Sequence, residues 1–282
     1  QLRTTENVDV VVVVGHEGND SNELLATLSG DSRIDAIVNA HTHSSYASSV
    51  KRSDGVEIPY LQAGSAGKKY GVIELNIDTS TKQVTGGTAA TKNNSGSKDS
   101  NIEKIVSALK EETAPVFERI LGIASDTIER YGAADWAATA LKDYANVEVG
   151  IINIGGIRSQ AFPIYQGDSI TVSKLYEIMP FDNVLKTVDL KGSDLKILIN
   201  DGTLVKSVNV YKNNATGEIL INGLPLEDDR VYSVASIDYI FDNTHYPFYK
   251  GENQVNTGIL FRDILIDRVE KDQTIVLVTR GN

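Results

Sequence analysis

The chain has 282 residues, of which 41% are hydrophobic and 23% are charged, the proportions of an ordinary globular protein. Its formal net charge of −11 repels phosphate backbones, so duplex nucleic acid is not an expected partner. The absence of cysteine excludes disulfides, thiolate zinc sites and cysteine nucleophiles, and no apolar run is long enough to predict a membrane-spanning helix.

The beginning of the chain has the pattern of a βαβ unit. Residues 8–14, VDVVVVV, form a β-branched run without alternation, which predicts a parallel strand covered on both faces. SNELLATLSG, residues 21–30, predicts a short helix ended by glycine, and IDAIVNA, residues 34–40, predicts a second strand. Ligands in open α/β sheets lie at the carboxyl ends of the strands, so the residues that follow these strands are the candidates for a site.

Three of the four histidines follow the two strands, His16 after the first and His41 and His43 after the second. Neutral imidazole is a common metal ligand, and parallel neighbours lie about 4.8 Å apart, so His16 and His41 can reach one ion. On an extended strand His41 and His43 face opposite ways, which favours two ions with one histidine on each. The alternative is that all three are polar loop residues. The nearby carboxylates, none at a convincing spacing, are Glu17, Asp20 and Asp54.

The remaining elements indicate a second, different half. Residues 75–84, LNIDTSTKQV, predict a hairpin, and the polar residues 92–101 predict a linker. A helix is expected over residues 101–119, with apolar residues on one face and Pro115 ending or kinking it. Beyond it, helices and strands follow in a mixed α+β order, with Trp136 expected in the core.

Both halves resemble known families. VDVVVVVGHEG followed by IDAIVNAHTHS is similar to the last two motifs of calcineurin-like metallophosphoesterases, with Ala40 where that family usually has glycine. NIGGIRSQ, residues 153–160, and GDSITVSKLYEIMPFDN, residues 167–183, resemble the C-terminal domain of 5′-nucleotidases and UDP-sugar hydrolases. The resemblance covers nearly the whole chain. It implies a fold that is α/β and then α+β.

The domains that the resemblance implies are the C-terminal part of a metallophosphoesterase α/β sandwich (residues 1–98), a linker helix (99–119) and a mixed α+β 5′-nucleotidase C-terminal domain (120–282). It further implies a metal-dependent phosphohydrolase of nucleotides, of 5′-nucleotidase or UDP-sugar hydrolase type. Such an enzyme acts outside the cytoplasm, in the periplasm, at the cell surface or extracellularly. Two divalent ions, zinc, manganese, iron or cobalt, would be bound, with His16 and His41 on one and His43 at the other.

The resemblance also assigns residues that bind the nucleotide or nucleoside substrate. They are Asn153, Gly155, Gly156, Arg158, Phe181 and Tyr239. The chemistry of these residues suits the roles. Glycine lets the backbone approach a ligand closely, a planar guanidinium can donate two hydrogen bonds to a phosphate, and a base can stack between two aromatic rings. The alternatives are core packing for Phe181 and a surface salt bridge for Arg158.

The chain departs from the family pattern in two ways. The family's earlier metal motifs and its catalytic histidine would precede residue 1, so the chain is expected to be a truncated portion without a catalytic residue, whose partner is the missing N-terminal portion. Alone it would then be a nucleotide-binding module without hydrolytic activity; a cyclic-nucleotide 2′-phosphodiesterase of the same fold is the other alternative. His245 stands where the family has a ribose-binding carboxylate, and Arg130 lies near the position of a further substrate-binding arginine.

Overall fold

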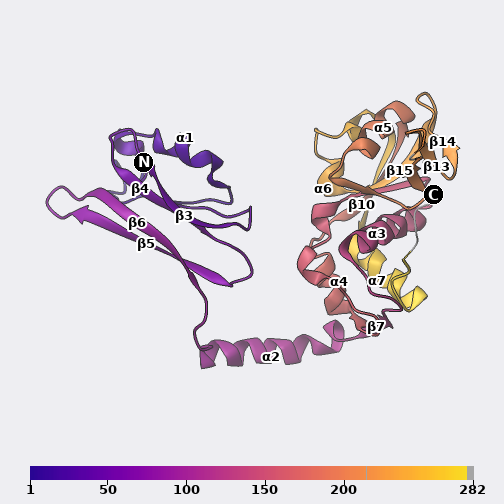
Figure 1. Ribbon diagram of the computed structural model, residues 1–282, viewed down its shortest axis with the longest axis horizontal. Coiled ribbons are helices and arrows are strands. Elements are labelled where there is room, and N and C mark those ends of the chain that lie inside the picture. The colour runs from indigo at the N-terminus through magenta and orange to yellow at the C-terminus, as the bar shows by residue number, and fades with distance from the viewer. Residues whose placement is uncertain (214, 278–282) are drawn as a thin grey trace. The chain divides into compact units, whose positions relative to one another are not determined.

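The computed structural model describes residues 1–213 and 215–277, which form two compact units, Gln1–Ser100 and Asn101–Asn282 (Figure 1). Both units mix helices with strands, which confirms the predicted fold class. Among the described residues, no helix combines the length and the apolar character needed to cross a membrane.

The first unit is built on a four-stranded sheet. Its elements are β1 (Val12–Val14), α1 (Asn22–Ala26), β2 (Ala36–Val38), β3 (Ser45–Lys51), β4 (Glu57–Ala63), β5 (Lys69–Asp78) and β6 (Gln83–Asn93). The sheet has the order β1-β2-β4-β3, in which β1, β2 and β4 are parallel and β3 is antiparallel. The predicted βαβ unit is therefore confirmed. The predicted hairpin is also confirmed as β5 and β6, of which β6 lies against β3 and β4 (Figure 1).

The first strand differs from its prediction. It is shorter than residues 8–14 and lies at the edge of the sheet, paired only with β2. The expectation that it is covered on both faces is wrong for the described residues, because Val12 is 46% exposed and Val14 is 78% exposed. A β-branched run reports preference for extended backbone, but burial depends on which other elements are present to cover it.

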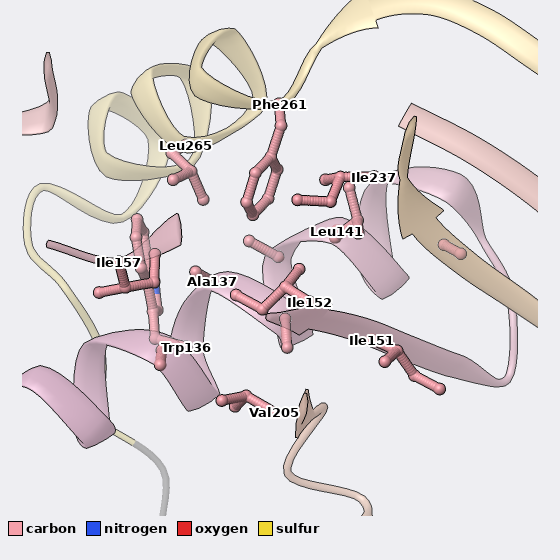
Figure 2. Packing of buried hydrophobic residues seen from close by; sticks show 14 of the residues in the cluster. Trp136, Ala137, Leu141, Ile151, Ile152, Ile157, Val205, Ile237, Phe261 and Leu265 are labelled. Carbon is pink, nitrogen blue, oxygen red and sulfur yellow. The ribbon is translucent and has the colours of Figure 1, made fainter. Parts of the chain in front are cut away.

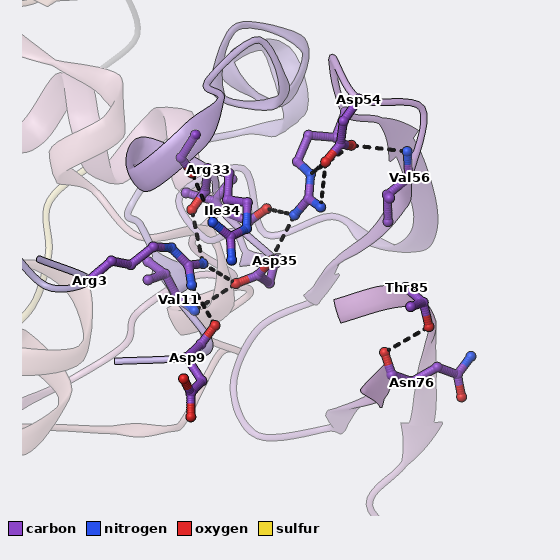
Figure 3. A network of polar contacts seen from close by, with 12 residues as sticks. Arg3, Asp9, Val11, Arg33, Ile34, Asp35, Asp54, Val56, Asn76 and Thr85 are labelled. Carbon is purple, nitrogen blue, oxygen red and sulfur yellow. Dashed lines mark hydrogen bonds and ion pairs between the residues drawn. The ribbon is translucent and has the colours of Figure 1, made fainter. Parts of the chain in front are cut away.

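A buried polar network holds the N-terminal segment to the start of β2 (Figure 3). Asp35 accepts hydrogen bonds from Arg3 Nη2 at 2.5 Å, from Arg52 Nη1 at 2.7 Å and from the N–H of Val11 at 2.8 Å. Arg52 also donates from Nη2 to Asp54 at 2.8 Å. Burying a carboxylate is costly unless its oxygens are paired, and here two guanidinium groups and an amide pair them.

The expected helix between the halves is α2 (Ser100–Phe117). None of its residues is buried, and the side chains of Ile105 and Leu109 on the apolar face are 56% and 54% exposed. Pro115 lies inside α2 and the helix continues to Phe117, so this proline does not end it at once.

The second unit is organised around a five-stranded mixed sheet of order β11-β8-β15-β10-β16. These strands are β8 (Val149–Asn153), β10 (Val184–Lys191), β11 (Leu204–Lys206), β15 (Val231–Ile237) and β16 (Glu252–Leu260). Smaller sheets pair β7 (Ile120–Ile123) with β9 (Ser169–Thr171), and join β12 (Val210–Lys212), β13 (Ile219–Ile221) and β14 (Leu224–Pro225). The helices are α3 (Arg130–Ala145), α4 (Val172–Ile178), α5 (Gly192–Asn200), α6 (Asp238–Phe241) and α7 (Phe261–Asp272).

Helices α3 and α7 pack together over this sheet (Figure 2). The alanines of α3 favour the helical conformation, and their small side chains let α3 lie close to the sheet. The helix ends at Asn146, whose backbone is left-handed with φ of 53°. Trp136 of α3 is 4% exposed, which confirms its prediction, and it lies with Phe261 and Leu265 of α7 in one cluster. This core fixes the start of α7, whose first residue, Phe261, donates its N–H to the carbonyl of Asn183 at 2.8 Å.

Candidate functional site

His16 and His41 meet beyond the carboxyl ends of β1 and β2. These strands are parallel neighbours, and Gly15 donates its N–H to the carbonyl of Val38 at 2.9 Å. His41 Nδ1 lies 3.2 Å from His16 Nε2, with ring centroids 5.0 Å apart and the planes at 66°. Both rings are exposed. Two imidazole nitrogens at this distance can share one proton or bind one cation together.

His43 lines the same hollow as this pair. The backbone that places it there differs from the one expected from the sequence. The expectation of an extended strand is wrong here, because β2 ends before the histidines and both have left-handed backbone, with φ of 69° at His41 and 59° at His43. Histidine is one of the residues enriched in that region. Gln62, fully buried, donates from Nε2 to Thr42 Oγ1 at 2.7 Å and so holds the turn between them.

The donor set around the histidines fits part of a metal site. The three rings share a hollow of about 660 Å³ with apolar side chains of β1, β2, β4 and β5. Of the carboxylates considered from the sequence, Asp54 is paired with Arg52 and Asp20 lines a different pocket. In the part of the chain that the structure describes, no three histidine, aspartate or glutamate side chains are grouped closely enough to hold a metal ion. The imidazoles are thus present without the carboxylate that a binuclear site requires.

The glycine turn of the second unit follows β8. Its residues Ile154–Gly156 form a 3-10 turn after Asn153. A Cβ on Gly155 would lie 3.3 Å from Asn153 Nδ2, and a Cβ on Gly156 would lie 3.3 Å from Asn153 Oδ1. The glycines therefore make room for the folded-back Asn153 side chain, whose Oδ1 is buried with no hydrogen-bond partner among the described residues.

Arg130, the first residue of α3, braces this turn. Its Nη2 donates to the carbonyl of Ile154 at 2.8 Å and its Nε to the carbonyl of Ile157 at 2.7 Å. Both contacts are to backbone, so the structure gives Arg130 a role in holding the turn that carries Arg158.

Arg158 and Phe181 lie next to each other. The Arg158 guanidinium is 5.5 Å from the centroid of the Phe181 ring, and the N–H of Arg158 donates to the carbonyl of Ile178 at 2.9 Å. Phe181 is 41% exposed, so the core-packing alternative is wrong. The salt-bridge alternative for Arg158 finds no support among the described residues, since none of their carboxylates forms an ion pair with it. A cationic group and an accessible aromatic face are therefore side by side.

Tyr239 lies on α6, which is tied to the Phe181 segment (residues 179–183) by side chains that sequence reasoning missed. Asp238 Oδ1 accepts from Asn183 Nδ2 at 2.7 Å and from the N–H of Tyr239 at 2.8 Å. A pocket of about 390 Å³ is lined by Asn183, Asp238 and Tyr239 with two neighbouring polar residues, and the Tyr239 side chain is 66% exposed. In the sequence, the feature that could have pointed to this contact is Asn183, the polar residue two positions after Phe181.

His245 lies in the loop after α6 and is exposed, with its ring 5.2 Å from that of Tyr246. Its N–H donates to Asn243 Oδ1 at 2.9 Å. The pKa of Asp201 is held below its usual value by hydrogen bonds from the hydroxyl and N–H of Thr203, and the charge of His245 contributes less. His245 therefore lies near enough to Asp201 to act on it electrostatically.

Known proteins are similar to this chain in sequence and in fold. The family described as 5′-nucleotidase, C-terminal domain, matches residues 77–250. An apyrase from Anopheles gambiae is 27% identical over 326 aligned positions, covering 96% of this chain and 56% of the apyrase. A 5′-nucleotidase from Bos taurus is 26% identical, covering 77% of this chain and 42% of the relative.

Among solved structures, a 5′-nucleotidase precursor from Thermus thermophilus superposes with a TM-score of 0.74 at 20% identity, covering 99% of this chain and 64% of that one. This likeness is one of fold. The chain spans about half the length of the curated relatives it matches.

Proposed function

This chain belongs to the 5′-nucleotidase family, and on that premise we propose that it is part of a metal-dependent nucleotide phosphohydrolase in which it supplies the nucleotide-binding site and some of the metal ligands. The observation that carries the proposal is the pairing of Arg158 with the exposed Phe181 ring at 5.5 Å. A guanidinium suits a phosphate, and an accessible aromatic face suits a base, so a nucleotide satisfies both at once. Tyr239 is the proposed second aromatic group.

The proposed division of labour follows residues 1–98, 99–119 and 120–282. His16 and His41 would hold one divalent ion, and His43 would approach a second. Such ions, when bound, supply an activated water and stabilise the negative charge that develops on phosphorus. The three histidines would orient the ions at the hollow that they share with β1, β2, β4 and β5. The location outside the cytoplasm belongs to the same proposal.

A second candidate is a module that binds a nucleotide without hydrolysing it. It is favoured by one observation: the described residues contain no group of three ligands placed to hold a metal ion. Both candidates assign nucleotide binding to the second unit. They differ in whether the histidines of the first unit are completed to a metal site. We propose that the missing N-terminal portion of the same protein is the partner that completes the metal site.

Binding can be tested by calorimetry with AMP and this chain. Phe181→Ala is expected to weaken binding about 5- to 150-fold, because stacking of one base on one aromatic ring contributes about 1–3 kcal/mol. Tyr165→Ala removes another exposed ring of the same unit and should leave the affinity unchanged. Equal affinity of the Phe181→Ala and wild-type chains would remove the basis for the proposed nucleotide site.

Metal binding can be followed separately by the visible spectrum of Co²⁺. His16→Ala and His41→Ala should each weaken Co²⁺ binding, whereas His245→Ala, which changes the one histidine outside the first unit, should not. Saturable AMP binding without phosphate release supports the incomplete site. Release of phosphate from AMP by this chain with Mn²⁺ would contradict it.

A further inference from the structure

Arg262 is a buried arginine close to the Phe181 segment. It is the second residue of α7 and is only 4% exposed. Arginine is rarely buried unless its guanidinium has partners. One face of the guanidinium lies 3.8 Å from the centroid of the Tyr176 ring on α4, an arrangement that is favourable when the cation is removed from water.

The hydrogen bonds that the Arg262 guanidinium makes to the described residues go to the segment that follows α4. Its Nη1 donates to the carbonyl of Met179 at 3.3 Å and to the carbonyl of Phe181 at 3.2 Å. Its Nη2 donates to Asp182 Oδ1 at 2.6 Å. These carbonyls lie beyond the last turn of α4, where no helical N–H is available to them. The guanidinium fork therefore fixes the backbone from which the Phe181 ring projects.

The helix that carries Arg262 is itself firmly placed. Phe261 and Leu265 are fully buried in the core around Trp136, as Figure 2 shows. The N–H of Phe261 donates to the carbonyl of Asn183 at 2.8 Å, so α7 holds the Phe181 segment on both sides of the ring. A side chain anchored in a well-packed core can position a surface loop more strictly than a loop can position itself.

We propose that Arg262 is a positioning residue for the nucleotide site: it holds the backbone of Phe181 so that the ring stays beside Arg158 and accessible to a planar ligand. The inference rests on the proposed function for the identity of the ligand, and on the observed contacts of Arg262 for the positioning itself. Arg262 does not touch the ligand. Lysine keeps the charge but lacks the planar fork that reaches two carbonyls and a carboxylate together.

The test is a double-mutant cycle read by AMP affinity. Arg262→Lys is expected to weaken AMP binding on the order of tenfold, because a hydrogen bond from a charged donor shifts an equilibrium by about that factor. In a Phe181→Ala background the same substitution should change the affinity little, because the ring that it positions is gone. Additive losses in the cycle would overturn the proposal.

Arg268→Lys is the matched control. It makes the same substitution on the same helix, where the guanidinium pairs with Asp143 at 2.8 Å and with Asp272 and has no contact with the Phe181 segment. Its AMP affinity should equal that of the wild type. An equal loss in Arg268→Lys would show that the effect comes from weakening α7 in general and would overturn the positioning role.

Hydrogen exchange separates a failure of this inference from a failure of the proposed function. Arg262→Lys should speed amide exchange in residues 179–183 without ligand, while the fluorescence of Trp136 reports an intact core. Faster exchange there supports the positioning role even if AMP is the wrong ligand. Unchanged exchange in this segment contradicts it, whatever Phe181→Ala does to AMP binding.

Discussion

Replacing Asp35 by asparagine removes the one charge on which two buried arginines of the first unit converge. The side chains of Asp35 and Arg52 are each 1% exposed and that of Arg3 is 5% exposed. An amide keeps the shape of the carboxylate but turns an NH₂ group toward groups that can only donate. The substitution therefore removes the charge that both guanidinium groups share and places an NH₂ group against one set of donors, while the geometry around them is unchanged.

The size of the effect follows from what each arginine retains. Removing one partner of a buried ion pair typically costs about 3–5 kcal/mol. Arg52 keeps the carboxylate of Asp54 and the carbonyl of Ile34, whereas Arg3 keeps only backbone carbonyls. We therefore expect a loss near the lower end, about 3 kcal/mol. At a urea dependence of about 1–3 kcal/mol per molar, the midpoint of the first unit should fall by about 1–3 M.

Two optical signals separate the units in a urea titration. Trp136 is the only tryptophan of the chain and lies in the second unit, so its fluorescence follows that unit, whereas far-ultraviolet circular dichroism follows both. Asp35→Asn should move the dichroism transition and leave the fluorescence transition in place. Asp54→Asn, whose side chain is 48% exposed, should cost at most about 1 kcal/mol. Equal losses for the two variants, or a shift confined to the fluorescence transition, would refute the reasoning.

Two other substitutions test the packing and the electrostatics. Gly150→Ala should lower the stability of the second unit by about 1–3 kcal/mol or more, because the added Cβ would collide with the carbonyl oxygen of Ala138. Urea unfolding followed by the fluorescence of Trp136 measures this loss. The control is Gly202→Ala, whose added Cβ meets open space and should leave the stability unchanged. A hydrogen bond from Arg52 holds the pKa of Asp54 below its usual 3.8, so the stabilisation that Asp54 adds is complete above that pH and is lost as the pH falls through the lower folded value. The stability difference between wild type and Asp54→Asn should accordingly shrink in titrations from about pH 5 to about pH 2, and a constant difference would contradict it.

The sequence predicted the features that depend on local periodicity. Parallel pairing of two strands separated by a short helix brings the residues that follow both strands to one edge of the sheet. For that reason His16 Nε2 and His41 Nδ1 lie 3.2 Å apart. Trp136 in the core also agrees with a local pattern, since it stands among the small apolar residues in the middle of α3, whereas Tyr131 and Tyr144 near the ends of the same helix are 68% and 48% exposed.

The features that it did not predict depend on contacts between distant segments. The left-handed backbone of His41 and His43 is held by Gln62, about twenty positions further along the chain, and no rule of strand alternation contains that contact. The exposure of Val14 depends on which elements cover β1, and a run of valines carries no information on that. Asn183 and Asp238 are 55 positions apart and become partners only in the folded second unit.

The three arginines around the proposed nucleotide site show why residue type alone does not identify a ligand-binding group. Arg130 donates to two backbone carbonyls of the glycine turn, and Arg262 donates to two carbonyls of the Phe181 segment. For Arg158, in contrast, the described residues provide no acceptor to its guanidinium, which lies beside an exposed ring. A guanidinium whose donors are already taken by backbone holds structure in place, and one whose donors are unused near an open aromatic face is available to a phosphate. On this criterion Arg130 and Arg262 set the positions of two loops, and Arg158 is the arginine that keeps unused donors, as the proposed nucleotide site requires.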